Sequence, residues 1–457
     1  MKSSVALLLA LLATALCGRV SAAEPSPHSP NSADRIKPYA EDPRYWQYEG
    51  QPVLLLGGTK DDSLFQIPDL KEHLDLLASV GGNYIRNTMS ARVDKGFEVQ
   101  AFRRLPGGKY DLEQWNDEYW TRFGNLLRWT HERDIIVQIE VWDRFDYTDA
   151  RGINHWQASP YRPENNVNYT GDETGLADRY PDHPSRDKQP FFHTIPGMER
   201  YQKKYDLIRR FQERFVAKML SHGLGYGNVL YCMNNETSTS PQWGQYWMDL
   251  IRRAAAEQGV DVYVTDMFDD GWKPEQSEKI RLALDRPELY AFIEISQVNS
   301  RNFGEDHWKR LQWVLGQVKR HRRPVNNTKI YGAGKTSWGS GEPKDGVERF
   351  WRDVLAGCAS ARFHRDGGGT GLQPISQASL QAARKLESII KLWDVEPRND
   401  LLGQRSENEA YLAARPGEAY ALYFTDGGSV DLDLTDAKGS FQLKWIAVAT
   451  GDWAAQE

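Results

Sequence analysis

Residues 228–241 read NVLYCMNNETSTSP, an apolar segment that passes directly into polar residues and then into a helix start. Apolar side chains alternate between Val229 and Met233, which predicts a buried strand. Ser240 followed by Pro241 is typical of the N-cap and first turn of a helix. We therefore predict a strand that delivers polar side chains at its carboxyl end, followed by a helix.

The same order of strand and amphipathic helix repeats along most of the chain. Besides the segment above, short apolar runs predict strands at residues 53–57, 83–87, 135–141, 261–265, 289–295, 324–328 and 360–364. Each run is followed by apolar residues at three-and-four spacing, which predicts a helix. Eight such pairs favour an α/β fold of the (β/α)8 TIM-barrel type over residues 40–395, rather than an open doubly wound sheet.

The pattern changes after residue 395. Period-two alternation predicts strands at residues 411–413, 419–424, 430–434 and 441–448, separated by Gly-containing turns. We expect residues 396–457 to form a small antiparallel β-sandwich. Its abrupt end at Glu457 raises the expectation that its last strands are missing.

The first residues have the layout of a secretory signal peptide. Lys2 precedes an apolar run over residues 5–16, and residues 1–23 end in Ser-Ala-Ala. A lipoprotein anchored at Cys17 is the alternative, but Leu16 is bulky where such sites need a small residue. We predict a secreted or periplasmic protein with a disordered leader at residues 24–39.

Composition excludes several functional classes. The chain has 457 residues, 40% of them hydrophobic, and a formal charge of −6 without a basic block, which argues against nucleic acid as a partner. No run after the signal peptide is long enough to span a bilayer. Metal-ligand spacings such as Cys-x-x-Cys are absent, so we expect neither a metal nor a cofactor. The sequence does not indicate an oligomeric state.

Two further features of composition bear on structure and on ligands. Cys232 and Cys358 lie in apolar stretches, and we interpret them as buried thiols, with a single disulfide as the alternative. The chain also has 16 Trp and 21 Tyr. Aromatic rings with a polar edge are well suited to stacking against sugar rings, so a carbohydrate is the partner we predict.

The polar residues after the 228–233 segment are the first candidates for chemistry. Glu236 can give or take a proton, and Asn235 can hydrogen-bond a substrate hydroxyl beside the reacting bond. An acid near a helix start can also serve as a cap, but Ser240 already fills that position. Catalysis by Glu236 is therefore the interpretation we favour.

Other polar residues stand at the carboxyl ends of predicted strands, where barrels of this type place their active sites. Glu294 has apolar neighbours, so its carboxylate must be paired, for example with Arg86, or functional. Asp143 can be an ordinary loop acid and His364 an ordinary core histidine. The long irregular stretch of residues 143–196 is expected to wall the cleft with Trp156, Tyr161 and Phe192. The predicted substrate-binding residues are Arg86, Asn87, Trp142, Asp143, Asn235, Asp266, Gln297 and His364, and the predicted catalytic residues are Glu236 and Glu294.

Several motifs resemble a known group of proteins. They are GGTKDD at residues 57–62, the Asn235-Glu236 pair, YALYFTDGGSVDLDL at 420–434 and KWIAVATGDW at 444–453. Together they resemble secreted cellulase-like barrels of the retaining glycosidase superfamily, followed by a β-domain often labelled collagen-binding. The resemblance covers most of residues 40–457. It implies Glu236 as general acid/base, Asn235 as a binder of the sugar 2-hydroxyl and Arg86 as support for the nucleophile.

The chain departs from this pattern where the superfamily places its nucleophilic Glu. Residues 323–331 read RPVNNTKIY, with Thr328 and Lys329 at that place. A retaining enzyme needs two carboxyl groups about 5–5.5 Å apart. Glu294 is the first alternative nucleophile, and loop residue Glu342 is another.

Two further alternatives remain open. Asp143 or Asp266 could serve as the base of an inverting enzyme, in which the carboxyl groups lie about 6.5–9.5 Å apart. The site could also bind sugar without cleaving it. We predict a secreted glycoside hydrolase acting on a polysaccharide or oligosaccharide, with a non-catalytic glycan-binding protein as the competing hypothesis.

Overall fold

The computed structural model describes residues 34–334, 340–435 and 437–454. The predicted signal peptide, residues 1–23, and residues 24–33 of the predicted leader lie outside the described residues. Residues 34–39 of that leader are not disordered as predicted, because Ile36 is buried and β1 (Lys37–Pro38) pairs with β2 (Trp46–Tyr48). No helix in the described ranges is long and apolar enough to cross a membrane.

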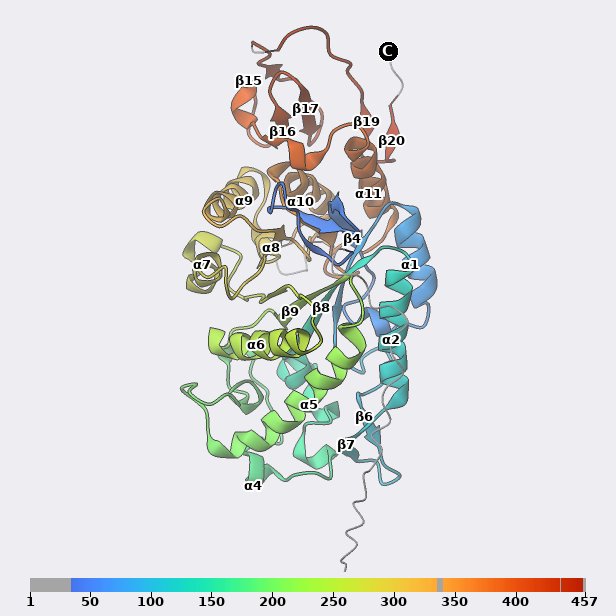
Figure 1. The fold of residues 1–457 in the computed structure, drawn as a ribbon, viewed down its shortest axis with the longest axis vertical. Helices are drawn as coiled ribbons and strands as arrows, with labels where there is room; N and C mark the ends of the chain where they lie inside the picture. Colours follow the sequence, from blue (N-terminus) through green and yellow to red (C-terminus); the bar gives the residue numbers. More distant parts are fainter. Residues whose placement is uncertain (1–33, 335–339, 436, 455–457) are drawn as a thin grey trace, which may run out of the picture.

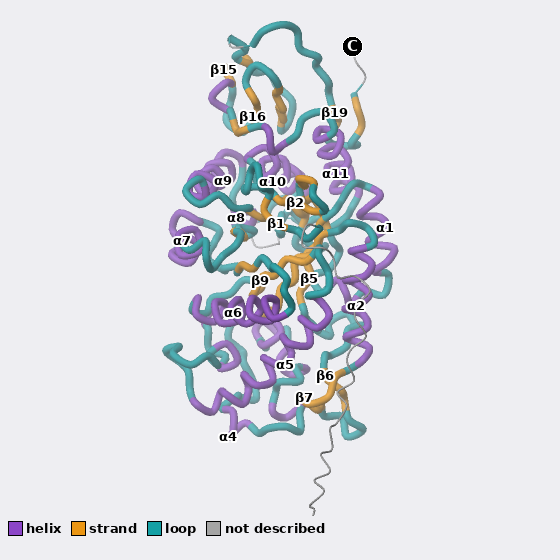
Figure 2. The backbone as a smooth tube through the Cα atoms, viewed as in Figure 1, coloured by secondary structure: helices purple, strands orange, loops and turns teal. Residues whose placement is uncertain are grey.

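Short parallel strands occupy the centre of the larger part of the molecule, and helices surround them (Figures 1 and 2). The longest are β8 and β9, which pair in parallel register from Val137 opposite Val229 to Asp143 opposite Asn235. Strand β9 also pairs with β10, and β8 with β5. The central strands are β4 (Leu55–Gly58), β5 (Tyr84–Thr88), β8 (Ile136–Asp143), β9 (Val229–Asn235), β10 (Val264–Thr265), β11 (Ile293–Glu294), β12 (Val325–Asn326) and β13 (Ser360–Phe363).

The remaining strands continue this arrangement. Strand β13 pairs with β4, and β11 pairs with β12, all in parallel. Backbone hydrogen bonds link the separate ladders, among them those from Asn83 to Leu56, from Ala291 to Val264 and from Ala359 to Val325. The predicted α/β class is confirmed, and each predicted strand of the 53–364 region overlaps an observed one.

Each central strand is followed by an amphipathic helix whose apolar face lies on the strands. Helix α6 begins at Pro241, and the Ser240 side chain accepts a hydrogen bond from the backbone of Gln242, as the sequence predicts. Its buried residues include Trp243 and Trp247, four apart on one face. The eight principal helices are α1 (Leu70–Ser79), α2 (Asp117–His131), α5 (Asp206–Gly223), α6 (Pro241–Glu257), α7 (Glu278–Asp285), α9 (Gly304–Val318), α10 (Pro343–Ala356) and α11 (Pro374–Glu387).

Some predicted strands are longer than the observed ones. The predicted strand at 289–295 is reduced to β11, Ile293–Glu294, because Leu289 and Tyr290 both donate to the Arg286 carbonyl in a turn. A local turn hydrogen bond competes with the ladder for the same backbone group. Periodicity alone therefore places the strand but overestimates its length.

The C-terminal region forms small antiparallel sheets above α10 in the view of Figure 1. Strand β16 (Ala410–Arg415) pairs with β17 (Ala419–Phe424) and with β14 (Glu396–Pro397). The prediction of a strand at 441–448 is wrong for most of its length. Only β19 (Ile446–Ala447) is present, and Leu443 is 69% exposed, so no opposing sheet covers its apolar side.

The long insert after β8 is not irregular throughout. It contains short helical segments, among them α3 (His155–Ala158) and α4 (Gly171–Thr174), and α4 begins with a capping box between Thr170 and Glu173.

Cys232 and Cys358 are buried free thiols, which confirms the favoured interpretation of the sequence over the single disulfide.

Candidate active site

A pocket of about 760 Å³ lies at the carboxyl ends of the central strands. Of the residues predicted from the sequence, it is lined by Asn235, Glu236, Gln297 and His364. The long insert contributes Phe145, Ile153, His155 and His183, and the loops after later strands contribute Asp269, Trp272, Arg301, Lys329 and Tyr331.

Glu236 follows the last residue of β9 in an unusual backbone conformation. Its φ is 58°, in the left-handed region that non-glycine residues rarely adopt. The next residue holds this turn in place, because Thr237 N donates to the Met267 carbonyl at 2.9 Å. Strained conformations of this kind persist where surrounding structure enforces them, and they concentrate at functional sites. The conformation sends the Glu236 side chain into the pocket.

The two oxygens of the Glu236 carboxylate have different surroundings. Oε1 accepts from Gln297 Nε2 at 2.9 Å, from Lys329 Nζ at 2.6 Å and from the Tyr331 hydroxyl at 3.1 Å. The nearest cation to Oε2 is the Arg144 guanidinium, at 3.7 Å. Three donors therefore fix one oxygen, while the other has only a long charge contact.

These cations determine the charge of Glu236. Burial alone would raise its pKa, but the positive charges of Lys329 and Arg144 outweigh burial and hold the pKa well below its usual range. The carboxyl group is thus ionised at neutral pH. In this ionised form the carboxylate accepts hydrogen bonds and has no proton of its own to give.

Lys329 is the most consequential residue that the sequence did not single out as functional. Its side chain is 1% exposed, and Nζ bridges Glu236 Oε1 and Asn235 Oδ1. Lys329 lies three residues after the end of β12. In the sequence this position stood out only because a carboxylate is expected there and is missing. Its partner Glu236 is 93 residues away in the sequence, so no local pattern indicated the pair.

A second ion pair borders Glu236. Both terminal nitrogens of Arg144 bind Asp269, at 2.9 and 2.8 Å, and Ser238 donates to the same carboxylate at 3.0 Å. Asp269 and Arg144 both line the pocket. This bidentate pair fixes the loop after β10 against the start of the insert.

A third charged cluster surrounds Asp62, which follows β4 and lines the pocket. Its carboxylate contacts Arg86, Arg365 at 2.7 Å and Arg92 at 3.4 Å. Burial opposes ionisation, but these guanidinium groups hold the pKa of Asp62 well below its usual range. Arg86 itself does not line the pocket; it supports Asp62 and Glu140 from behind.

Glu294 lies away from the pocket lining, deep among the strands. It accepts hydrogen bonds from Ser296 and from Gln138 Nε2 at 3.2 Å, and burial raises its pKa. The suggested ion pair between Glu294 and Arg86 is wrong, because Arg86 pairs with Asp62 and Glu140. A buried carboxyl held by hydroxyl and amide groups is the alternative that the sequence did not separate from an ion pair.

The other predicted acids also have structural partners. Asp143 binds Arg92 and the backbone of Phe145. Asp266 accepts from Asn234, and burial raises its pKa to about 7. Glu342 is exposed and caps helix α10. None of these three acids is among the described residues that line the pocket around Glu236.

Two predicted sugar-binding residues are buried in the fold. Asn87 accepts from the backbone of Phe65, which fixes the loop after β4. Trp142 packs among Phe215, Trp243 and Trp247, with ring centroids 5.2 to 6.0 Å apart. An aromatic at a strand end was expected to face the ligand, but the large helices α5 and α6 provide an apolar partner surface for it.

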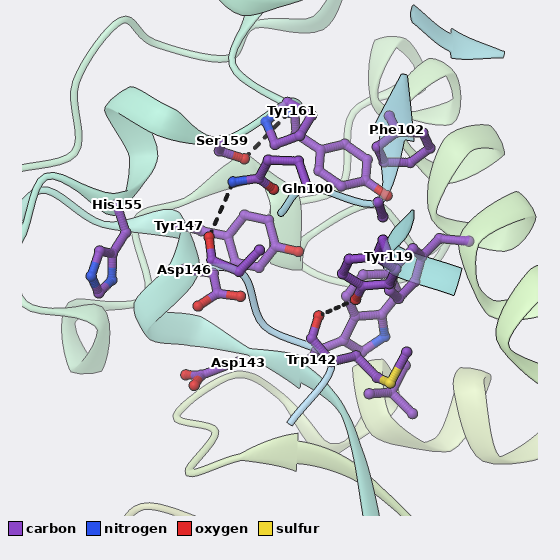
Figure 3. A pocket seen from close by; sticks show the side chains of 16 residues that line it. Gln100, Phe102, Tyr119, Trp142, Asp143, Asp146, Tyr147, His155, Ser159 and Tyr161 are labelled. Carbon is purple, nitrogen blue, oxygen red and sulfur yellow. Dashed lines mark hydrogen bonds between the residues drawn. The ribbon is translucent and has the colours of Figure 1, made fainter. Parts of the chain in front are cut away.

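The insert borders the pocket with different residues from those expected. Trp156, Tyr161 and Phe192 are at most 4% exposed, and none lines the large pocket. Tyr161 instead lines a separate cavity of about 40 Å³ together with Trp142 and Asp146 (Figure 3). His155 lines both spaces. Among the residues described, no cluster of His, Cys, Asp and Glu is arranged to hold a metal ion.

Comparisons with known proteins agree with this architecture. A family model described as "Domain of unknown function (DUF6298)" matches residues 93–268. A search of curated proteins finds no match by sequence. A glycoside hydrolase family 5 protein from Bacteroides vulgatus has a similar structure, with a TM-score of 0.57 and 12% identity over 92% of this chain and 87% of that one. A second B. vulgatus structure, described as "a putative glycoside hydrolase", gives a TM-score of 0.50 and 11% identity over 84% of this chain and 68% of the other. At these identities the similarity concerns the fold, which the chain shares with glycoside hydrolase structures.

Proposed function

We propose that this chain is an exported glycoside hydrolase that cleaves a glycosidic bond in the pocket around Glu236. The strand order supports a (β/α)8 barrel, and the similarity to glycoside hydrolase structures supports the reaction class. The observation that carries the proposal is the state of Glu236: one oxygen fixed by three donors, the other directed into a pocket large enough for a saccharide.

Glu236 and Lys329 form one proton-handling unit in this proposal. The ammonium group carries the proton that the leaving oxygen needs, and the hydrogen bond of 2.6 Å keeps it next to the carboxylate. Asn235 is fixed by the same ammonium, which orients its amide for a sugar hydroxyl. Trp272 supplies an aromatic wall for the sugar ring.

Non-catalytic glycan binding is the second candidate. It is favoured by Lys329, which occupies the place of the second carboxylate in the glycosidases that the sequence resembles. A binding protein needs the aromatic wall and the polar floor but not the proton transfer.

A panel of neutral and acidic oligosaccharides distinguishes the two. Release of reducing ends by the wild type, with a loss of about 100-fold or more in Glu236→Gln, supports hydrolysis. Saccharide affinity measured by calorimetry should stay within a few-fold in that variant. Glu257→Gln, at the exposed end of α6, is the matched control for the loss of one carboxylate. Saccharide binding without turnover in the wild type would favour the binding protein.

A further inference from the structure

A second reactive group is needed if a glycosidic bond is to be cleaved by water. The pocket holds one other buried carboxylate on its floor, that of Asp62, which is 4% exposed and lines the same space as Glu236. Arg86, Arg92 and Arg365 hold it in the ionised form and in a fixed orientation. An ionised, immobilised carboxylate is the form that a base requires.

The imidazole of His364 lies directly beside this carboxylate. Nδ1 is 3.8 Å from Asp62 Oδ1, too far for a hydrogen bond. That nitrogen is buried and makes no hydrogen bond to any residue in the described ranges, although His364 lines the pocket. A buried polar atom without a protein partner calls for a water molecule. Burial lowers the pKa of His364, so the ring is neutral at neutral pH and one nitrogen can accept a hydrogen bond.

Tyr331 connects this pair to the other side of the site. Its hydroxyl binds Glu236 Oε1 at 3.1 Å, and its ring packs against the His364 ring with centroids 4.8 Å apart. Tyr331 therefore contacts both Glu236 and the His364 ring that lies beside Asp62, and Asp62 and Glu236 line the same pocket.

We infer that Asp62 is the base of the reaction and that it activates a water molecule held beside it by His364. The inference rests on the proposed hydrolysis. The water gives one proton to the Asp62 carboxylate while its oxygen forms a bond to the anomeric carbon. The bond from that carbon to the leaving oxygen breaks, and the leaving oxygen takes a proton from the Glu236–Lys329 pair. One water is consumed, and the proton on Asp62 returns to the pair through solvent.

Attack by water in a single step inverts the anomeric centre. The first test is therefore made on the wild-type protein: proton NMR of the first product released from a saccharide that the panel shows to be cleaved. Inversion is expected. Retention overturns the role of Asp62 but leaves hydrolysis at Glu236 standing, whereas absence of turnover on every saccharide overturns both.

Variants test the residue itself. Asp62→Asn should lower kcat/KM by about 100-fold or more. Asp62→Glu keeps the charge for the three arginines but moves the carboxylate, and a loss of at least about tenfold is expected. Asp61→Asn is the control, because Asp61 is adjacent in sequence and does not line the pocket as described. Near wild-type rates in folded Asp62→Asn, checked by thermal unfolding, would overturn the inference; should that variant not fold, Asp62→Glu and the product anomer decide.

Discussion

The ammonium of Lys329 lies 2.6 Å from Oε1 of Glu236, at the place where the glycosidases that this sequence resembles carry a second carboxylate. The pair brings opposite charges together where two like charges would be expected. It holds the pKa of Glu236 below its usual range, so the carboxylate is ionised before a substrate arrives.

Removing the lysine should raise the pKa of Glu236. In Lys329→Met, burial becomes the dominant influence, and the pKa of Glu236 should rise from well below its usual range to a value above it. Carbon NMR titration of the carboxyl groups measures the change. Lys329→Arg, which keeps the positive charge, should leave the pKa low. A pKa that stays low in Lys329→Met would show that Arg144 alone is sufficient.

Because of the backbone conformation at residue 236, we expect a glycine there to give a more stable protein than an alanine. At most positions alanine is the more stable, but φ is 58° here, and the left-handed region costs an L-residue about 1–2 kcal/mol. Glu236→Gly should therefore be more stable than Glu236→Ala by about 1 kcal/mol. Urea unfolding of the two variants measures the difference. Equal stability would mean that the loop relaxes once the side chain is gone.

Trp272 should contribute directly to saccharide affinity. It lines the pocket, and Lys273 and Arg301 lie over its ring at 4.9 and 5.5 Å from the centroid, which keeps the ring in place. Trp272→Ala should weaken binding about tenfold, and Trp272→Phe less. Trp445, which is 51% exposed in the C-terminal region, is the matched control. Equal losses in Trp445→Ala would argue against a specific contact.

Asp266 should make stability depend on pH. Burial raises its folded pKa to about 7, whereas an unfolded aspartate has a pKa of about 3.9. Between these values the folded state keeps a proton that the unfolded state releases. The free energy of unfolding should therefore fall by up to about 4 kcal/mol as pH rises through this window.

The isosteric variant Asp266→Asn has no proton to lose and should show a flatter profile. It retains an oxygen that can accept from Asn234, the existing partner at 2.8 Å. Chemical unfolding at about pH 4.5, 6 and 7.5 measures the free energy of unfolding of the wild type and of Asp266→Asn. These pH values cover the window of about 4 to 7 between the unfolded and folded pKa of Asp266. The same slope in both would assign the pH dependence to other groups.

Much of the fold was predictable because it depends on local periodicity. The strand that ends at Asn235 and the helix that begins at Pro241 follow from alternation and a Ser-Pro start. The lengths of the short strands were overestimated. The turn at Leu289 and the exposure of Leu443 depend on contacts that form only in the folded chain, which local periodicity does not show.

The site was predictable only in part, for the same reason. Glu236 follows a strand and was recognised from sequence, but its protonation depends on Lys329, which lies 93 residues further along the chain. Trp142 and Asp143 also end a strand, yet one faces the helices and the other an arginine. Sequence position places a residue at the carboxyl end of a strand, whereas its charge and direction depend on partners that are distant in sequence.

The contacts of the C-terminal sheet with the helices below it limit which C-terminal regions this chain can carry. Tyr423 stacks on Trp351 of helix α10, with ring centroids 5.5 Å apart, and Tyr411 packs against Trp308 of helix α9. Both tryptophans are at most 6% exposed. The region therefore covers the outer layer of helices around the central strands. A recombination event that exchanged it for an unrelated module would leave an aromatic surface open to aggregation, so the two parts should be inherited together.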